Sequence, residues 1–341
     1  MDNNHNNTNN PTSTQIPLNS HTTHTEQSMQ IKLPNDETIS YKEFGSYKNE
    51  TLILLHGNYN NKETFIQCID KLKTIYRIFT LDHRGFGESS CINPINSIYD
   101  FAEDLKLFIE ALKIKSPHLL GFSLGGGIAL AFKLLYPHLC NKVVLLAPIS
   151  ITGIPIYTVS SKNKRIRCNT KDQIKEHPYS KRIDQVIFEK DKNSIRQMLD
   201  LTFESNVDIE KFSEERKKQY EEYMNIVLNA WFQTRNPSDV MYAMAKMNFT
   251  RKDNSAFKGD GNIYRLREQV LIIHGTDDKV VPYRCSVETK EILGDLCKLV
   301  ELKNWGHNLI FHEDNNIYNT IIDYLNNTTI TQEKTNTQPK F

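Results

Sequence analysis

The sequence predicts an α/β protein in which helices flank a mostly parallel, eight-stranded sheet and a helical lid is inserted into the middle of the chain. Two observations predict this fold class. Short apolar runs recur, most of them followed by a turn and an amphipathic helical pattern, which is typical of a parallel sheet wound by helices. This alternation stops once, between Ile149 and about Leu266, and then resumes.

The eight strands are expected from these apolar runs. Gln30–Leu33 and Thr38–Phe44 form a leading antiparallel hairpin whose turn lies around Asn35 and Asp36. The six strands that follow consist mainly of apolar, β-favouring residues. They are expected at Thr51–Leu55, Tyr76–Leu81, His118–Phe122, Val143–Ala147, Val270–Ile273 and Lys298–Lys303.

Three crossover helices are expected between the strands, at Lys62–Thr74, Ser97–Lys113 and Leu124–Tyr136. The second has an apolar stripe at helical spacing, which indicates core packing rather than a binding face. The stripe consists of Phe101, Leu105, Phe108, Ile109 and Leu112.

The interrupted region predicts an inserted helical lid because long charged amphipathic patterns replace the strands there. These patterns lie at Ser194–Phe203, Asp208–Trp231 and Pro237–Met247. Over Lys162–Arg196, 11 Lys or Arg residues outnumber 5 Asp or Glu residues. The excess either steers an anionic substrate or forms a solvated face balanced by the acidic stretch Glu204–Glu222, and the second interpretation is the more ordinary one.

Both ends of the chain are polar, and we expect them to be disordered. The domain organisation that follows is a disordered Asn/Thr-rich segment at 1–28, a first core segment at 29–148, the lid at 149–266, a second core segment at 267–325 and a disordered tail at 326–341.

Charge and composition exclude several classes of partner. The chain has 42 basic and 41 acidic residues and a formal net charge of +1, which disfavours nucleic acid or an anionic membrane as a partner. The longest nearly apolar stretch, Leu119–Phe132, is too short and too rich in glycine to span a bilayer. The pattern after Met1 lacks a signal peptide, so we expect a cytoplasmic protein.

The six cysteines are scattered without metal-ligand spacing, so we expect reduced thiols, no bound metal and no cofactor. A small-molecule substrate is the expected partner. The choice between monomer and homodimer stays open.

A possible nucleophile lies in the segment Gly121-Phe122-Ser123-Leu124-Gly125, which directly follows one strand and precedes a helix. Its glycines allow a sharp turn that presents Ser123 on a strained backbone, at the sheet edge where open α/β folds bind ligands. The alternative is a glycine-rich helix start that only packs tightly on the sheet. A serine hydroxyl also needs a base and a carboxylate, so the hypothesis predicts an acid and a histidine on later post-strand loops. Both are present, as the pair Asp277 and Asp278 and as His307.

Four separated motifs give the chain a resemblance to a known family. His56-Gly57-Asn58 is similar to its oxyanion loop, the run from Asp82 to Ser89 to its D-x-R-G-x-G-x-S turn, and the Ser123 segment to its nucleophile elbow. Gly275 to Pro282 is similar to its G-x-x-D-x-x-[VI]-P pattern. Over roughly Gln30 to Leu325, the chain resembles the α/β-hydrolase superfamily in its lid-bearing form, which implies the α/β-hydrolase fold.

The resemblance assigns roles to single residues. The pattern that starts at Gly275 selects Asp278 as the acid and leaves Asp277 as the alternative. His307 is the favoured base, and His312, further along, is its competitor. The backbone N–H groups of Asn58 and Leu124 would form the oxyanion hole. We expect His56 to support the oxyanion loop, His274 to be structural, and His83 to lie on the surface of its turn.

The implied chemistry is acyl transfer from an ester, thioester or amide through an acyl-enzyme on Ser123. A serine at the elbow, where relatives that displace at carbon carry an aspartate, excludes dehalogenase and epoxide hydrolase chemistry. The leading hypothesis is a carboxylesterase-like serine hydrolase with a small to medium apolar substrate. The alternatives are a C–C bond hydrolase of the same fold and a ligand-binding protein without turnover. Lid aromatics such as Tyr223 and Trp231 either line an acyl pocket or pack in the lid's own core, the more ordinary role.

Overall fold

The structure is a computed structural model that describes residues 25–160, 162–200, 212–311 and 315–326. Its centre is one eight-stranded sheet with the order β1-β2-β4-β3-β5-β6-β9-β10. These strands are β1 (Thr25–Lys32), β2 (Thr38–Phe44), β3 (Thr51–Leu55), β4 (Arg77–Leu81), β5 (His118–Phe122), β6 (Val143–Leu146), β9 (Val270–Gly275) and β10 (Cys297–Leu302). Within this sheet, as the structure describes it, only the pairs of β2 with β1 and with β4 are antiparallel, which confirms the predicted mostly parallel sheet of eight strands.

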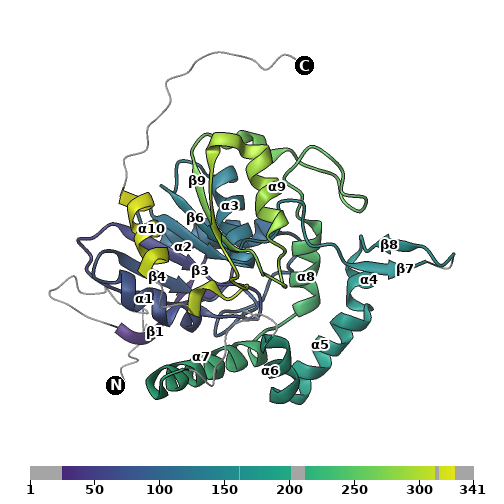
Figure 1. Cartoon of the computed structure of the whole chain (residues 1–341), viewed down its shortest axis with the longest axis horizontal. Coiled ribbons are helices and arrows are strands. Elements are labelled where there is room, and N and C mark those ends of the chain that lie inside the picture. Colours follow the sequence, from purple (N-terminus) through teal and green to yellow (C-terminus); the bar gives the residue numbers. More distant parts are fainter. Residues whose placement is uncertain (1–24, 161, 201–211, 312–314, 327–341) are drawn as a thin grey trace, which may run out of the picture.

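Helices cover both faces of the sheet (Figure 1). Alternate residues of each strand point to opposite faces, so Ile53 and Leu55 belong to one core and Leu52 and Leu54 to the other. The first core is completed by α2 (Ile98–Ala111), α3 (Leu124–Leu135) and α9 (Arg284–Leu293). The second is completed by α1 (Ile66–Leu72) and α10 (Asn315–Asn326). The apolar stripe predicted for α2 thus packs in the core.

The chain between β6 and β9 forms five described helices and a small hairpin, which run along the lower and right-hand sides of the sheet in Figure 1. The helices are α4 (Lys171–Lys175), α5 (Pro178–Glu189), α6 (Lys192–Asp200), α7 (Glu214–Phe232) and α8 (Pro237–Lys246). The start of α7 is fixed by Ser213, whose hydroxyl accepts a hydrogen bond from the Arg216 amide. Residues 208–211 of the helix expected from Asp208 lie outside the described part of the chain.

The hairpin corrects the expectation of an all-helical lid. Its strands, β7 (Tyr157–Val159) and β8 (Arg165–Arg167), pair antiparallel and form a sheet of their own. Each strand has only three residues and most of them are exposed, so there is no buried face to produce an alternating apolar pattern in the sequence.

Two boundaries also differ from the sequence prediction. β1 begins at Thr25, inside the segment 1–28 expected to be disordered, because its backbone pairs with β2 and needs no apolar side chains at this edge of the sheet. The predicted helix at Lys62–Thr74 begins as a 3₁₀ turn at Lys62–Phe65 and becomes α1 only from Ile66. The expected disorder at 1–24 and 327–341 concerns residues outside the described ranges.

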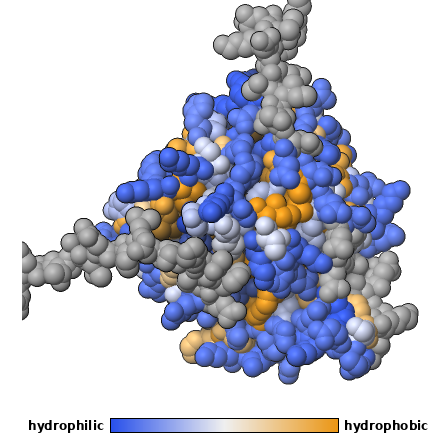
Figure 2. Space-filling view, turned by 90° about the vertical axis from the view of Figure 1, so that its left-hand side faces the viewer, coloured by the Kyte–Doolittle hydropathy of each residue, from blue (hydrophilic) through white to orange (hydrophobic). Residues whose placement is uncertain are grey.

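The side of the molecule with β1, α1 and α10 is mainly hydrophilic, and its hydrophobic residues form separate patches (Figure 2). No helix in the described ranges is both long and apolar enough to cross a membrane. All six cysteines are free, and four of them are buried.

Candidate active site

Ser123 lies in the turn that joins β5 to α3, with a backbone φ of 53° and ψ of −112°. Such a positive φ is strained for a residue with a side chain. The flanking glycines are required by close backbone contacts. A Cβ at Gly121 would lie 2.2 Å from the Gly125 carbonyl oxygen, and a Cβ at Gly125 would lie 1.9 Å from the Leu55 carbonyl oxygen. The turn is therefore possible only because both positions lack a side chain.

Asp278 lies in the loop after β9, with its carboxylate fully shielded from solvent. One oxygen, Oδ1, accepts hydrogen bonds of 2.8 Å from both the Val280 and the Val281 amides. The other, Oδ2, lies 2.6 Å from Nδ1 of His307. The loop amides thus fix the carboxylate, and the carboxylate fixes the His307 ring.

His307 lies in the loop after β10, and its ring packs 5.0 Å from the ring of Phe122, the neighbour of Ser123. Because Asp278 accepts a hydrogen bond through Nδ1–H of His307, Nε2 is left as the acceptor of the neutral ring. Ser123 and His307 both line one cavity. The structure thus brings Ser123, Asp278 and His307 to one edge of the sheet. The competing His312 lies outside the described residues.

Asp278 has a second partner, His274, which is not predicted from the sequence. His274, at the end of β9, is fully buried, and its Nε2 donates to Oδ2 of Asp278 at 2.9 Å and to the Val281 carbonyl at 2.9 Å. The hydroxyl of Ser286 lies 2.7 Å from the other ring nitrogen, Nδ1. The sequence signal for this contact is a histidine four residues before the acid. The spacing alone does not predict the hydrogen bond, because the contact forms only when the loop after β9 folds back onto the end of the strand.

These contacts determine the charge state of Asp278. Burial alone would raise the pKa of its carboxyl, but hydrogen bonds from His274 and His307 outweigh burial and hold that pKa well below the usual range. The neighbouring Asp277 is partly exposed, and its carboxylate lies 3.5 Å from the Thr276 hydroxyl. Asp278, and not the alternative Asp277, therefore makes the described contact with His307.

The Gly57–Asn58 loop after β3 lies against the turn that carries Ser123. A Cβ at Gly57 would be 3.3 Å from the Ser123 Cβ and 3.0 Å from the ring of Phe122. Asn58 lines the same cavity as Ser123. Within the described residues, no acceptor is found for the backbone N–H of Asn58 or of Leu124. Two amide donors beside the serine are thus available to a ligand.

Two buried histidines support this loop. His56 accepts a hydrogen bond of 3.1 Å from the His83 amide, and its Nδ1 lies 2.8 Å from the Gly57 carbonyl. His83 is only 3% exposed, so the expectation that it lies on the turn surface is wrong. The turn folds inward, and the His83 ring packs 4.2 Å from the ring of His56. Burial lowers the pKa of His56 to about 3 and lowers that of His83 well below its usual value.

The run from Asp82 to Ser89 is held by buried charge pairs. Lys62 donates to Asp82 through its ammonium at 2.9 Å and through its backbone amide at 2.7 Å. Arg84 makes two hydrogen bonds of 2.5 Å with Asp104 on α2. Removing one partner of such a pair leaves a buried charge uncompensated, so we interpret this run as structural.

The cavity at Ser123 has a volume of about 860 Å³ and lies between the sheet edge and the β6–β9 segment. Its interior is mainly apolar, with aliphatic side chains and methionines from α6, α7 and α8. Trp231 stacks on Tyr59 with ring centroids 4.1 Å apart, and Tyr223 donates a hydrogen bond of 2.9 Å to Asn308. Of the lid aromatics considered above, Tyr223 and Trp231 line this cavity.

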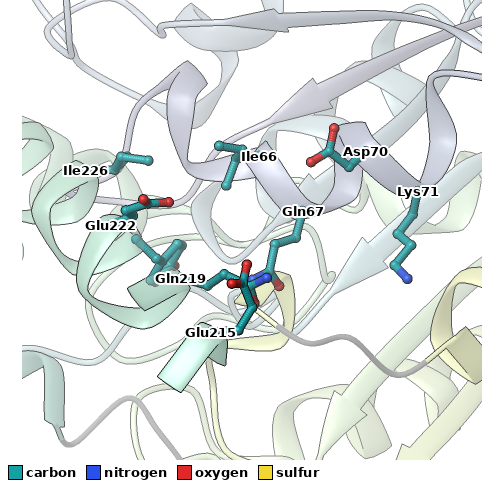
Figure 3. A pocket seen from close by; sticks show the side chains of 9 residues that line it. Ile66, Gln67, Asp70, Lys71, Glu215, Gln219, Glu222 and Ile226 are labelled. Atoms are coloured by element: carbon teal, nitrogen blue, oxygen red, sulfur yellow. The ribbon is translucent and has the colours of Figure 1, made fainter. Parts of the chain in front are cut away.

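A second hollow, of about 370 Å³, lies between α1 and α7 (Figure 3). Its labelled side chains include Asp70 and Lys71 of α1 and Glu215 and Glu222 of α7, so its wall is largely polar and charged. Neither Ser123 nor His307 lines it. Among the described residues, no group of three or more His, Cys, Asp or Glu residues could hold a metal ion.

Comparison with known proteins gives two matches to family models and several relatives. A model described as alpha/beta hydrolase fold matches residues 50–167, and one described as TAP-like protein matches residues 249–337. Over 302 residues the chain is 25% identical to the AB hydrolase superfamily protein YisY of Bacillus subtilis, a match that covers 87% of this chain and 98% of the relative.

A second relative matches a shorter part of the chain, and a solved structure superposes on most of it. The chain is 36% identical over 113 residues to the 2-hydroxy-6-oxononadienedioate/2-hydroxy-6-oxononatrienedioate hydrolase of Paraburkholderia phymatum, which covers 32% of this chain and 39% of that relative. An esterase from Exiguobacterium antarcticum superposes with a TM-score of 0.62 at 21% identity, covering 88% of this chain and 100% of the esterase. The esterase likeness shows a shared fold.

Proposed function

The chain belongs to the α/β-hydrolase superfamily, and we propose that it is a serine hydrolase with Ser123 as nucleophile, His307 as base and Asp278 as the acid of a triad. The observation that carries this proposal is the 2.6 Å contact between Asp278 and His307 at the cavity that also exposes Ser123. Three groups from three different strand ends meet there, in the chain order that this family of triads uses.

In the proposed mechanism, Oγ of Ser123 attacks a carbonyl carbon while Nε2 of His307 takes its proton. The resulting imidazolium is stabilised by Asp278, which stays ionised because hydrogen bonds lower its pKa. His307 then gives the proton to the leaving group, and an acyl-enzyme remains on Ser123. Water, deprotonated by the same imidazole, releases the acid and restores the serine.

The oxyanion that forms at the attacked carbonyl needs donors that are already in place. We assign this role to the backbone N–H groups of Asn58 and Leu124, which have no described acceptor of their own. The loss of one such donor typically costs about 10²- to 10³-fold in kcat, so this pair would supply a large share of the catalysis. The buried His56 and the Gly57 carbonyl hold the first donor's loop in position.

The apolar cavity favours a carboxylic ester, thioester or amide with a small to medium apolar acyl group. We propose that residues 149–266 form the lid that selects this group, since α6, α7 and α8 supply much of the cavity wall. The cytoplasmic location predicted from the sequence is part of the same proposal, and cell fractionation tests it.

A C–C bond hydrolase is the second candidate, because the relative from Paraburkholderia phymatum is named as a hydrolase of a dienedioate. A ligand-binding protein without turnover is disfavoured, since Ser123, Asp278 and His307 are all present.

Turnover of p-nitrophenyl esters from acetate to decanoate, followed at steady state and in the pre-steady state, tests the proposal. We expect a burst of p-nitrophenol from acyl-enzyme formation, and Ser123→Ala and His307→Ala should lower kcat by about 10⁴-fold or more. Full ester hydrolysis by His307→Ala would transfer the base role to His312. Cleavage of a 2-hydroxy-6-oxo-dienoate, with no cleavage of any ester, would favour the second candidate.

A further inference from the structure

Among the described residues, every Lys, Arg, Asp or Glu side chain that lines the cavity carries positive charge. The described residues that line the cavity include two basic side chains of the Lys or Arg type, Arg165 of β8 and Lys279 of the loop after β9. They include no Asp or Glu. Both side chains are exposed, which places them where the cavity meets solvent. One cation comes from the hairpin and the other from the core, so the mouth is positive on both sides.

Arg165 belongs to the basic stretch Lys162–Arg196, whereas Lys279 comes from the core. Away from the cavity, several basic residues of the inserted segment have acidic partners: Lys171 pairs with Asp239, Lys181 with Glu176, Arg182 with Asp191 and Arg196 with Glu221. Arg165 and Lys279 form no ion pair within the described residues. Arg165 instead lies 4.0 Å from the ring centroid of Tyr157. Four cations of the basic stretch are thus paired with acids away from the cavity, whereas the two cations that line the cavity have no such pair within the described residues.

One polar side chain that lines the cavity on this side, His177, is already engaged. Nε2 of His177 lies 3.0 Å from the Tyr157 carbonyl, and its Nδ1 accepts a hydrogen bond of 3.2 Å from the Tyr179 amide. The His177 ring thus connects the start of α5 to β7. The guanidinium of Arg165 and the ammonium of Lys279 are the Lys or Arg groups of the described cavity lining that can pair with an anionic ligand.

We propose that the substrate carries an anionic group, such as a carboxylate, at the end that lies at the mouth, and that Arg165 and Lys279 select it. The inference rests on the proposed function and names the substrate class within it. The part next to Ser123 is apolar because the cavity interior is apolar, and the charged end faces two cations that form no ion pair within the described residues. Exposed charge pairs contribute little each, so we expect the two cations together to give roughly a three- to tenfold preference.

Matched esters test this preference. Mono-p-nitrophenyl suberate carries a distal carboxylate on the acyl chain, and its methyl ester is the neutral control. 4-Acetoxyphenylacetate and its methyl ester place the charge on the leaving group instead. We expect kcat/KM to be about three- to tenfold higher for the anionic member of at least one pair, and the preference to shrink as salt screens the charges. Equal or lower values for the anionic member of both pairs would overturn the inference.

The variants are compared by the anionic-to-neutral ratio of kcat/KM, which cancels losses common to both substrates. The double variant Arg165→Gln with Lys279→Gln should bring the ratio to about one. Lys181→Gln removes an exposed cation of α5 that already has a partner and lies away from the cavity, so it should keep the wild-type ratio. A ratio that survives in the double variant, or falls equally in Lys181→Gln, would contradict the assigned role. If no ester is hydrolysed and Ser123 cannot be labelled, the proposed function itself fails.

Discussion

The α/β core and the segment inserted between β6 and β9 contribute to the cavity in different ways. The core supplies Ser123 and His307 to the cavity from the loops after β5 and β10, and Asp278, in the loop after β9, contacts His307. The inserted segment supplies mostly apolar side chains from helices and one charged hairpin. Under the proposed function, the sheet edge is therefore the place where the substrate bond is broken, and the inserted segment is the part that selects the substrate.

Substitutions in the core and in the inserted segment are also expected to have different effects on stability and activity. In the core, Gly121 and Gly125 are in contact with backbone atoms, and Asp278 is held by two amides and two histidines. In the insertion, pairs such as Arg182 with Asp191 are largely exposed and contribute little to stability. We therefore expect core substitutions to abolish activity or folding and lid substitutions to change selectivity.

The largest expected effect distinguishes two neighbouring carboxylates of the core. Asp278→Asn should lower kcat by about 10⁴-fold, because the amide cannot hold His307 in the right tautomer or stabilise the imidazolium. Asp277→Asn, one residue away, should change kcat by less than about threefold because Asp277 makes no described contact with His307. Steady-state ester hydrolysis measures both, and the reverse ranking would move the acid to Asp277.

The next effect concerns folding of the core. Gly125→Ala should destabilise the protein by about 3 kcal/mol or more, because the new Cβ would overlap the Leu55 carbonyl at 1.9 Å. Gly294→Ala is the control, since Gly294 has a positive φ of 55° but open space around it and should lose less. Urea unfolding compares the two. An equal loss would show that the contact at Gly125 is easily relieved.

A smaller effect is expected from pH. The folded state keeps His56 neutral, with a pKa of about 3, whereas an unfolded histidine titrates near 6.5, so acid favours unfolding as pH falls below about 6.5. The depressed pKa of Asp278 acts in a lower window, because its stabilisation is lost only below about pH 4. Between pH 6.5 and 5, His56→Gln should lose about 1–2 kcal/mol less of its unfolding free energy than the wild type. Denaturant titrations with the same pH slope for both proteins would contradict this.

The smallest effect tests the inserted segment. Trp231→Ala removes a cavity wall and should raise the ratio of kcat/KM for decanoate over butyrate esters by about tenfold or less. The ratio is informative even if the variant is less stable, because both substrates meet the same folded fraction. An unchanged ratio would mean that the acyl group does not contact this part of the cavity.

Much of the core could be predicted from the sequence because its strands are apolar and its turns need particular residues. β3 at Thr51–Leu55 and β5 at His118–Phe122 have the predicted bounds, and the Ser123 turn was recognisable from two glycines. The hairpin at Tyr157–Arg167 was not predictable from periodicity because it has no buried face. His274 was missed as a partner of Asp278 because this contact depends on the path of a loop.

The residues of the cavity wall are also difficult to predict from the sequence. Tyr223 and Trp231 are buried in a hydrophobic core, as expected, and they also line the cavity because α7 packs over the sheet edge. One sequence shows that a helix is amphipathic without showing what its apolar face covers. The roles of Ser123, Asp278 and His307 stay predictions until they are tested.

Labelling with a fluorophosphonate, followed by mass spectrometry of the adduct, tests the central claim most directly. We predict that the wild-type protein is modified at Ser123, that Ser123→Ala is not modified, and that Ser123→Ala keeps a thermal midpoint close to that of the wild type. A folded wild-type protein without an adduct, or with its adduct on another residue, would contradict the claim that Ser123 is an activated nucleophile.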